Sequence, residues 1–87
     1  QPWRLPSAGS VFKNPVHGPA GKFIEETGLK GFRMGDAQVS EQHANFIVNL
    51  GKARARDILS LVAMIREKVF QEKGVWLEME IQVVGED

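Results

Sequence analysis

The sequence predicts an α+β domain in which two helices pack on one face of a largely antiparallel sheet, in the order β-α-β-β-α-β. Apolar residues recur at helical spacing over residues 20–27 and again over residues 54–73. The segments around them are short, alternate between apolar and polar residues, and are separated by glycine-containing turns, as strands are. Each helix has one apolar stripe and the last strand has one apolar face, which predicts two layers.

The first predicted strand begins behind Gly9 and ends at Pro15, which has no N–H group to donate to a neighbouring strand. Side chains alternate along a strand, so Ser10 and Asn14 should share one face. A hydroxyl and an amide reached past a glycine could hold a polar ligand. The residues alone favour the simpler interpretation that Ser10 is an ordinary loop serine bonded to its own backbone.

The helix over residues 20–27 has sequence signals at both ends. Gly18 is the expected N-cap and Pro19 the expected first helical residue, where the missing N–H group costs nothing. Gly28 should end the helix, with Leu29 packing back against it. The apolar face predicts packing, and we assign this helix no chemistry.

The helix over residues 54–73 is longer, and Gly74 is expected to close it. Its apolar stripe consists of Ile58, Leu61, Val62, Ile65 and Val69. In the last strand, Glu78 and Glu80 alternate with the apolar residues Leu77, Met79, Ile81 and Val83. Glutamates on an open sheet face either stay solvated or face a partner domain, where a carboxylate has to be paired or functional.

Two or three short strands joined by tight turns are predicted between residues 31 and 49, with a break at Gly35 and Asp36. Residues 46–48 are apolar on both faces, which predicts a central place in the sheet. His43 lies just before this segment. A lone histidine is usually a surface or capping residue, and no second histidine lies nearby in the sequence to form a metal site.

Composition limits the classes of function. The chain has 87 residues, so we expect residues 1–87 to form a single domain with a thin core. The 11 basic and 11 acidic residues balance, whereas a nucleic-acid-binding domain would carry a basic face. The chain has no cysteine, which excludes disulfides and thiol catalysis, and its longest apolar run, residues 61–65, is too short to span a membrane. No signal peptide is visible, and the opening on Gln1 leads us to expect a piece of a longer protein.

Five motifs, in this order, resemble those of the UDP-N-acetylenolpyruvoylglucosamine reductases. They are AGSVFKNP at residues 8–15, AGKFIEETGLKG at 20–31, GDAQVS at 35–40, ANFIVN at 44–49 and GVWLEME at 74–80. The match covers essentially the whole chain, and several motifs in sequence are much more specific than any one alone. The chain is similar to the C-terminal, substrate-binding domain of that bacterial flavoenzyme, whose FAD-binding domains would lie upstream.

The resemblance implies an activity for the full-length protein. The family reduces the enolpyruvyl ether of UDP-N-acetylglucosamine to the lactyl ether of UDP-N-acetylmuramate for peptidoglycan, with NADPH and a bound FAD passing the hydride. FAD and NADPH are therefore the cofactors expected in the full-length enzyme, with none in this chain, which we expect to be inactive alone. The expected partners are the UDP-sugar substrate and the upstream domains of the same chain, with no nucleic acid and no membrane. The resemblance implies the bacterial cytoplasm as the location.

The same resemblance implies roles for four residues. Ser10 falls on the family's proton donor, and Glu80 on the glutamate that helps to stabilise the enol-like intermediate. Asn14 falls on a contact to substrate, and His43 on a position where the family has a polar side chain near the substrate. The family's active-site arginine would lie upstream. Met79 stands where proline is common, and this departure could loosen the backbone that aims Glu80.

An interpretation from another class is also open. The order β-α-β-β-α-β suits a ferredoxin-like regulatory or ligand-binding module without catalysis. In such a module Ser10 and Glu80 would be far apart or solvated. Convergence of their side chains on one cleft would favour the enzyme.

Overall fold

The structure of the chain is a computed structural model that describes residues 10–80. In chain order its elements are α1 (Ala20–Glu26), β1 (Arg33–Met34), β2 (Ala37–Val39), β3 (Ile47–Asn49) and α2 (Ala55–Lys73). The three strands form one antiparallel sheet in the order β1-β2-β3. The predicted α+β class is confirmed.

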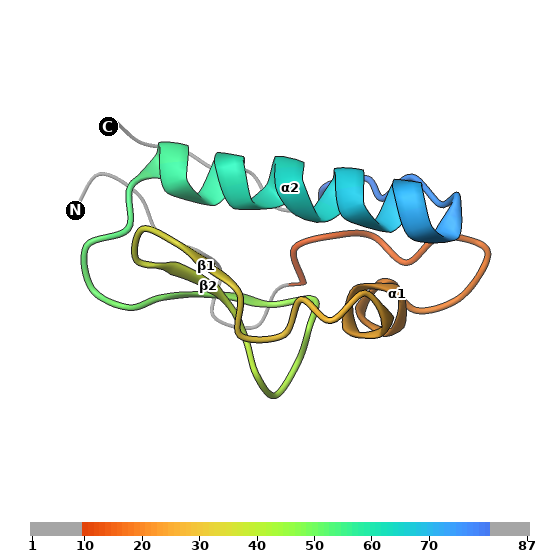
Figure 1. The fold of residues 1–87 in the computed structure, drawn as a ribbon, viewed down its shortest axis with the longest axis horizontal. Coiled ribbons are helices and arrows are strands. Elements are labelled where there is room, and N and C mark those ends of the chain that lie inside the picture. Colours follow the sequence, from red (N-terminus) through yellow and green to blue (C-terminus); the bar gives the residue numbers. More distant parts are fainter. Residues whose placement is uncertain (1–9, 81–87) are drawn as a thin grey trace.

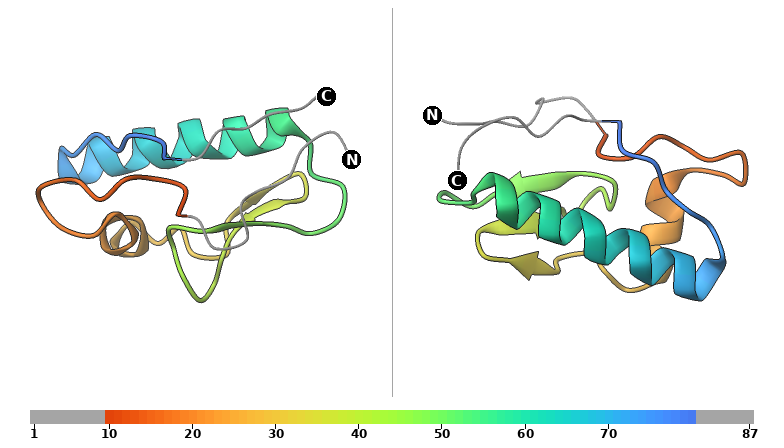
Figure 2. Two further views of the ribbon diagram at one scale, coloured as in Figure 1. Left: turned by 180° about the vertical axis from the view of Figure 1, so that it is seen from behind. Right: turned by 90° about the horizontal axis from the view of Figure 1, so that it is seen from above.

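The long helix α2 organises the core. It lies across the hairpin of β1 and β2 and also packs against α1, which lies below its C-terminal half (Figure 1; Figure 2 shows the same arrangement from behind and from above). The apolar stripe predicted for α2 is confirmed, because all five of its residues are buried. Within residues 10–80, no helix is both long enough and apolar enough to cross a membrane.

The start of α1 differs from its prediction by one residue. Pro19 is the N-cap residue, with an extended ψ of 134°, and the helix begins at Ala20. Gly18 lies outside the helix, so its predicted role as N-cap is wrong. The physical reason is a distant acceptor: Asn14 Oδ1 accepts the N–H of Ala20 at 2.9 Å, and no local cap is needed. At the other end Gly28 has a φ of +78°, as predicted.

The turn between β1 and β2 also holds the start of α2. Gly35 has a φ of +59°, and a Cβ there would lie 2.8 Å from the carboxylate of Asp57. That carboxylate accepts the N–H of Arg54 at 2.9 Å, just before α2 begins. Asp36 accepts the N–H of Lys52 at 2.9 Å. The predicted break at these two residues therefore shapes a hairpin turn and also anchors the longest helix.

Residues 46–48 were predicted to be central in the sheet, and this prediction is wrong for the part of the chain that the structure describes. The central strand is β2, which pairs with both neighbours and whose Ala37 and Val39 have no exposed surface. Among residues 10–80, β3 pairs with β2 alone. Ile47 is buried, while Val48 on the other face is 38% exposed. An isolated apolar side chain is common on a protein surface, which is why the two-sided pattern misled.

The predicted first and last strands meet, but only briefly within residues 10–80. Phe12 and Met79 form a single antiparallel bridge. Two main-chain hydrogen bonds of 2.8 Å flank this bridge. Residues 81–83 of the predicted last strand lie outside the described residues. The two ends of the described part of the chain are thus brought side by side, which places the segment of Ser10 next to that of Glu80.

The C-terminal ends of the two helices are linked by charge. Lys73 Nζ lies 3.0 Å from Glu26 Oε1. The hydrogen bond from Lys73 lowers the pKa of the Glu26 carboxyl, because it stabilises the charged form. Immediately afterwards Gly74 ends α2 in the left-handed conformation, as predicted, and its N–H donates to Phe70 O at 2.9 Å.

Candidate functional site

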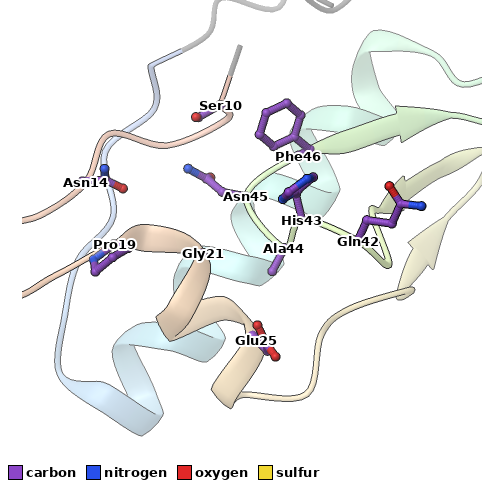
Figure 3. Close-up of a pocket in the computed structure, with 10 residues that line it drawn as sticks. All are labelled: Ser10, Asn14, Pro19, Gly21, Glu25, Gln42, His43, Ala44, Asn45 and Phe46. Atoms are coloured by element: carbon purple, nitrogen blue, oxygen red, sulfur yellow. The ribbon is translucent and has the colours of Figure 1, made fainter. Parts of the chain in front are cut away.

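A cavity of about 300 Å³ lies between the N-terminal segment, α1 and the loop before β3. Figure 3 shows the side chains around it. Three of the four predicted site residues, Ser10, Asn14 and His43, line this cavity together. The other lining residues are Pro19, Gly21, Glu25, Gln42, Ala44, Asn45 and Phe46.

Asn45 joins two walls of the cavity. Its Oδ1 accepts the N–H of Phe12 at 2.9 Å, and its Nδ2 donates to the carbonyl oxygen of the same residue at 2.9 Å. Its own main-chain oxygen accepts the N–H of Val11 at 2.8 Å. The side chain therefore pairs with the N-terminal segment as a neighbouring strand would. Sequence reasoning did not single out Asn45, although a polar residue directly before a buried strand was a usable signal.

Ser10 is half-buried at the start of the described chain. It directly precedes Val11 and Phe12, which form the hydrogen bonds with Asn45 that we call the clamp. The hydrogen bonds at Val11 and Phe12 fix the direction of the backbone that carries it. Glu25 is the one charged residue that lines the cavity among residues 10–80, and its carboxylate is paired with Lys30 at 3.5 Å. Ser10 thus lines a cavity whose walls are mostly uncharged.

Asn14 has a structural role that the sequence did not predict. Its Oδ1 accepts the N–H of Ala20 and so caps α1. This bond fixes the orientation of the amide at the edge of the cavity (Figure 3). The Nδ2 donor has no partner within residues 10–80, and it is the atom through which Asn14 could hold a ligand oxygen.

His43 enters the cavity from a tight loop. The hydroxyl oxygen of Ser40 accepts the N–H groups of Gln42 and His43, at 3.1 and 3.2 Å. The imidazole lies against Phe46, with ring centroids 5.5 Å apart and planes tilted by 45°. Within residues 10–80 no cluster of three His, Cys, Asp or Glu side chains could hold a metal ion. His43 is therefore placed to donate or accept a hydrogen bond toward a ligand. Gln42, its neighbour on the cavity wall, was missed by the sequence reasoning.

The structure places Glu80 next to the segment of Ser10 without bringing its carboxylate into the cavity. The N–H of Glu80 donates to the carbonyl oxygen of Val11 at 2.8 Å, and the side chain is exposed. Leu77 is fully buried while Glu78 and Glu80 are exposed, so the predicted alternation holds for this part of the strand. Glu78 lines a second cavity of about 280 Å³ beside Trp76. The main-chain segments that carry Ser10 and Glu80 thus lie side by side, but the two side chains do not line one cavity.

Nearly the whole chain matches one known protein family. The family model described as UDP-N-acetylenolpyruvoylglucosamine reductase, C-terminal domain, matches residues 1–84. The chain belongs to this family. The motifs around the cavity, from Ser10 to Phe46, lie inside the matched region.

Individual reductases named for the same activity match the chain along its whole length. UDP-N-acetylenolpyruvoylglucosamine reductase from Syntrophobacter fumaroxidans is 61% identical over 85 residues, which cover 98% of this chain and 25% of the relative. The protein of the same name from Prochlorococcus marinus is 55% identical over 87 residues, covering 100% of this chain and 29% of the relative.

A solved structure gives the same result for the fold. The crystal structure of UDP-N-acetylenolpyruvylglucosamine reductase from Thermus caldophilus matches with a TM-score of 0.70 and 52% identity, covering 86% of this chain and 26% of that chain. The chain therefore spans about a quarter of the length of the reductases that it matches.

Unfolding measurements can test the capping role of Asn14 separately from any contact that Asn14 makes with a ligand. Asn14→Ala removes the acceptor for the Ala20 N–H and should lower the free energy of unfolding by about 1 kcal/mol. Asn14→Asp keeps an acceptor oxygen and should unfold like the parent. Urea unfolding of the two variants measures the difference. Equal losses from both variants would contradict the capping role.

Proposed function

We propose that this chain is the substrate-binding domain of a reductase that converts UDP-N-acetylglucosamine enolpyruvate to UDP-N-acetylmuramate with NADPH, in peptidoglycan synthesis. The proposal is carried by one observation: Ser10, Asn14 and His43, far apart in sequence, line one cavity in a chain that matches the family over residues 1–84. On the same resemblance, we propose the bacterial cytoplasm as the location of the full-length protein.

The cavity lined by Ser10, Asn14 and His43 does not fit a flavin dinucleotide. The cavity of about 300 Å³ is at the small end of ligand sites, and within residues 10–80 no lysine or arginine lines it to meet a pyrophosphate. We therefore propose that FAD is held by the part of the reductase that lies outside this chain. When bound there and reduced by NADPH, it would supply the hydride for the vinyl group.

The residues of this chain would supply the proton. Reduction of an enolpyruvyl group adds a hydride to one alkene carbon and a proton to the other, and the second carbon carries an enol-like anion until the proton arrives. A serine hydroxyl is a poor acid in water, so it needs a strongly basic acceptor and a fixed position. Ser10 would give its proton to this carbon, and solvent would later return a proton to the serine oxygen. The clamp at Phe12 supplies the fixed position.

The remaining site residues would orient and stabilise the substrate. Asn14 would donate from Nδ2 to a substrate oxygen while Oδ1 keeps its bond to α1. His43 would make a polar contact from the opposite wall. Glu80 would help to stabilise the enol-like intermediate once the rest of the reductase covers its exposed strand face.

In the full-length reductase, Ser10→Ala should block protonation without blocking flavin reduction. Reduction of the flavin by NADPH precedes the step that needs the hydroxyl, so its rate should stay normal. Reoxidation by the enolpyruvyl substrate should slow by about 10²–10⁴-fold, the usual scale for a positioned acid. Stopped-flow absorbance of the flavin measures both steps, with Ser60→Ala on the exposed face of α2 as the control. Normal reoxidation in Ser10→Ala would rule out this donor.

Glu78 and Glu80 form a matched pair of one residue type on one strand face. They lie roughly 6–7 Å apart along the strand, so only one can reach the reacting carbon. In the full-length reductase, Glu80→Gln should lower kcat by about a hundredfold or more. Glu78→Gln should leave kcat within about threefold, because its exposed side chain faces the second cavity. Equal losses, or a larger loss at Glu78, would show that the proposal gives the role to the wrong carboxylate.

The isolated 87-residue chain should be inactive, because the proposal places the flavin and the active-site arginine outside it. Titration of the purified chain with FAD, followed by an NADPH oxidation assay, should show neither stoichiometric binding nor turnover. Circular dichroism during the same titration shows whether the helices are formed. Turnover by the isolated chain would overturn the proposal that the flavin and the active-site arginine lie outside it.

A further inference from the structure

We propose that Asn45 is the positioning residue for Ser10: its buried side chain holds the backbone of the proton donor at the angle that protonation requires. This inference rests on the proposed role of Ser10. It adds a residue that makes no contact with the reacting atoms and acts through the main chain of Val11 and Phe12.

The hydrogen bonds of Asn45 are specific for an amide. An asparagine offers both a donor and an acceptor, and here each reaches the main chain of Phe12 at 2.9 Å. Asn45 is only 9% exposed and is the single polar residue in the buried core of residues 10–80. A buried polar group that loses its partner is costly, so the two groups strongly restrict each other's position.

Asn45 lies where the three walls of the cavity meet. The N-terminal segment is bonded to its side chain, and His43 lies two residues before it on the loop wall. The α1 wall touches it at Gly21, where a Cβ would lie 3.6 Å from both the Cβ and the main-chain nitrogen of Asn45. In Figure 3 its amide extends from the loop toward the segment that carries Ser10 and Asn14.

The hydrogen bonds of Asn45 should affect the rate of protonation by Ser10. Val11 and Phe12 follow Ser10 directly, so a change in their direction moves the hydroxyl. A misplacement of about 1 Å can cost about 100-fold in rate when a reacting group must be aligned. Reduction of the flavin by NADPH does not use the hydroxyl, so it should be insensitive to Asn45. Reoxidation of the flavin by the enolpyruvyl substrate goes to completion only when the enol-like anion is protonated, so it should depend on Asn45. A residue that served stability alone would not discriminate between the two half-reactions.

The test uses the full-length reductase with two substitutions at Asn45. Asn45→Asp keeps the shape and the acceptor but loses the donor to the Phe12 carbonyl. Asn45→Ser is too short to reach both groups of Phe12, and it keeps the test usable if the aspartate variant does not fold. Asn49→Asp is the matched control, because Oδ1 of Asn49 only accepts hydrogen bonds, from Gly51 at 2.7 Å and Ala53 at 3.1 Å.

Two readouts are compared. Hydrogen–deuterium exchange of the peptide covering residues 10–14 should accelerate in both Asn45 variants and stay unchanged in Asn49→Asp. Stopped-flow reoxidation of the flavin by the enolpyruvyl substrate should slow by about 10- to 100-fold in the Asn45 variants, while reduction by NADPH stays within twofold. Faster exchange with normal reoxidation, or an equal slowing of both half-reactions, would overturn the positioning role.

A double-mutant cycle separates failure of this inference from failure of the proposed function. If Asn45 acts through Ser10, then adding Asn45→Asp to Ser10→Ala should slow reoxidation no further than Ser10→Ala alone. Multiplied losses in the double variant would show that Asn45 acts independently and would overturn this inference only. Normal reoxidation in Ser10→Ala itself would overturn the proposed function, and this inference with it.

Discussion

The pairing of the Asn45 amide with the main chain of Phe12 is the interaction on which the cavity depends. It ties the N-terminal segment to the loop before β3 across 33 residues of sequence. Within residues 10–80 the segment forms one bridge, from Phe12 to Met79, and the Asn45 side chain adds a strand-like pairing with Phe12. Because both groups are buried, neither can exchange its partner for water without a large penalty. The N-terminal segment and the loop before β3 are therefore fixed relative to each other before any ligand arrives.

A second constraint fixes the scaffold under these walls. The β1–β2 turn at Gly35 approaches Asp57 so closely that no side chain fits, and Asp57 in turn caps α2. The long helix cannot shift along the hairpin without breaking this contact. Its other end is linked to α1 through Glu26 and Lys73. The helix that forms the core is thus held at both ends, and α1, which carries the third wall of the cavity, is held with it.

The strand that carries the two glutamates is attached to the same helix. Arg66 of α2 donates from Nε to the carbonyl oxygen of Leu77 at 2.8 Å, and its guanidinium lies 4.7 Å from the ring centroid of Trp76. One side chain therefore restrains the backbone just before Glu78 through a hydrogen bond and a cation–π contact. The backbone that leads to Glu78 and Glu80 is thus held from α2, by contacts to Leu77 and Trp76.

The sequence by itself determined the features that depend on nearby residues. The apolar stripe of α2, the glycine ends of both helices and the turn at Gly35 follow from spacing and backbone conformation, and all are confirmed. The family motifs led to Ser10, Asn14 and His43, which the structure places around one cavity. Only the tertiary structure decided which strand is central, how α1 is capped and what fixes the backbone next to Ser10. Each of these depends on a contact between distant parts of the chain, and local pattern carries no information about which distant group will satisfy a backbone N–H or carbonyl oxygen.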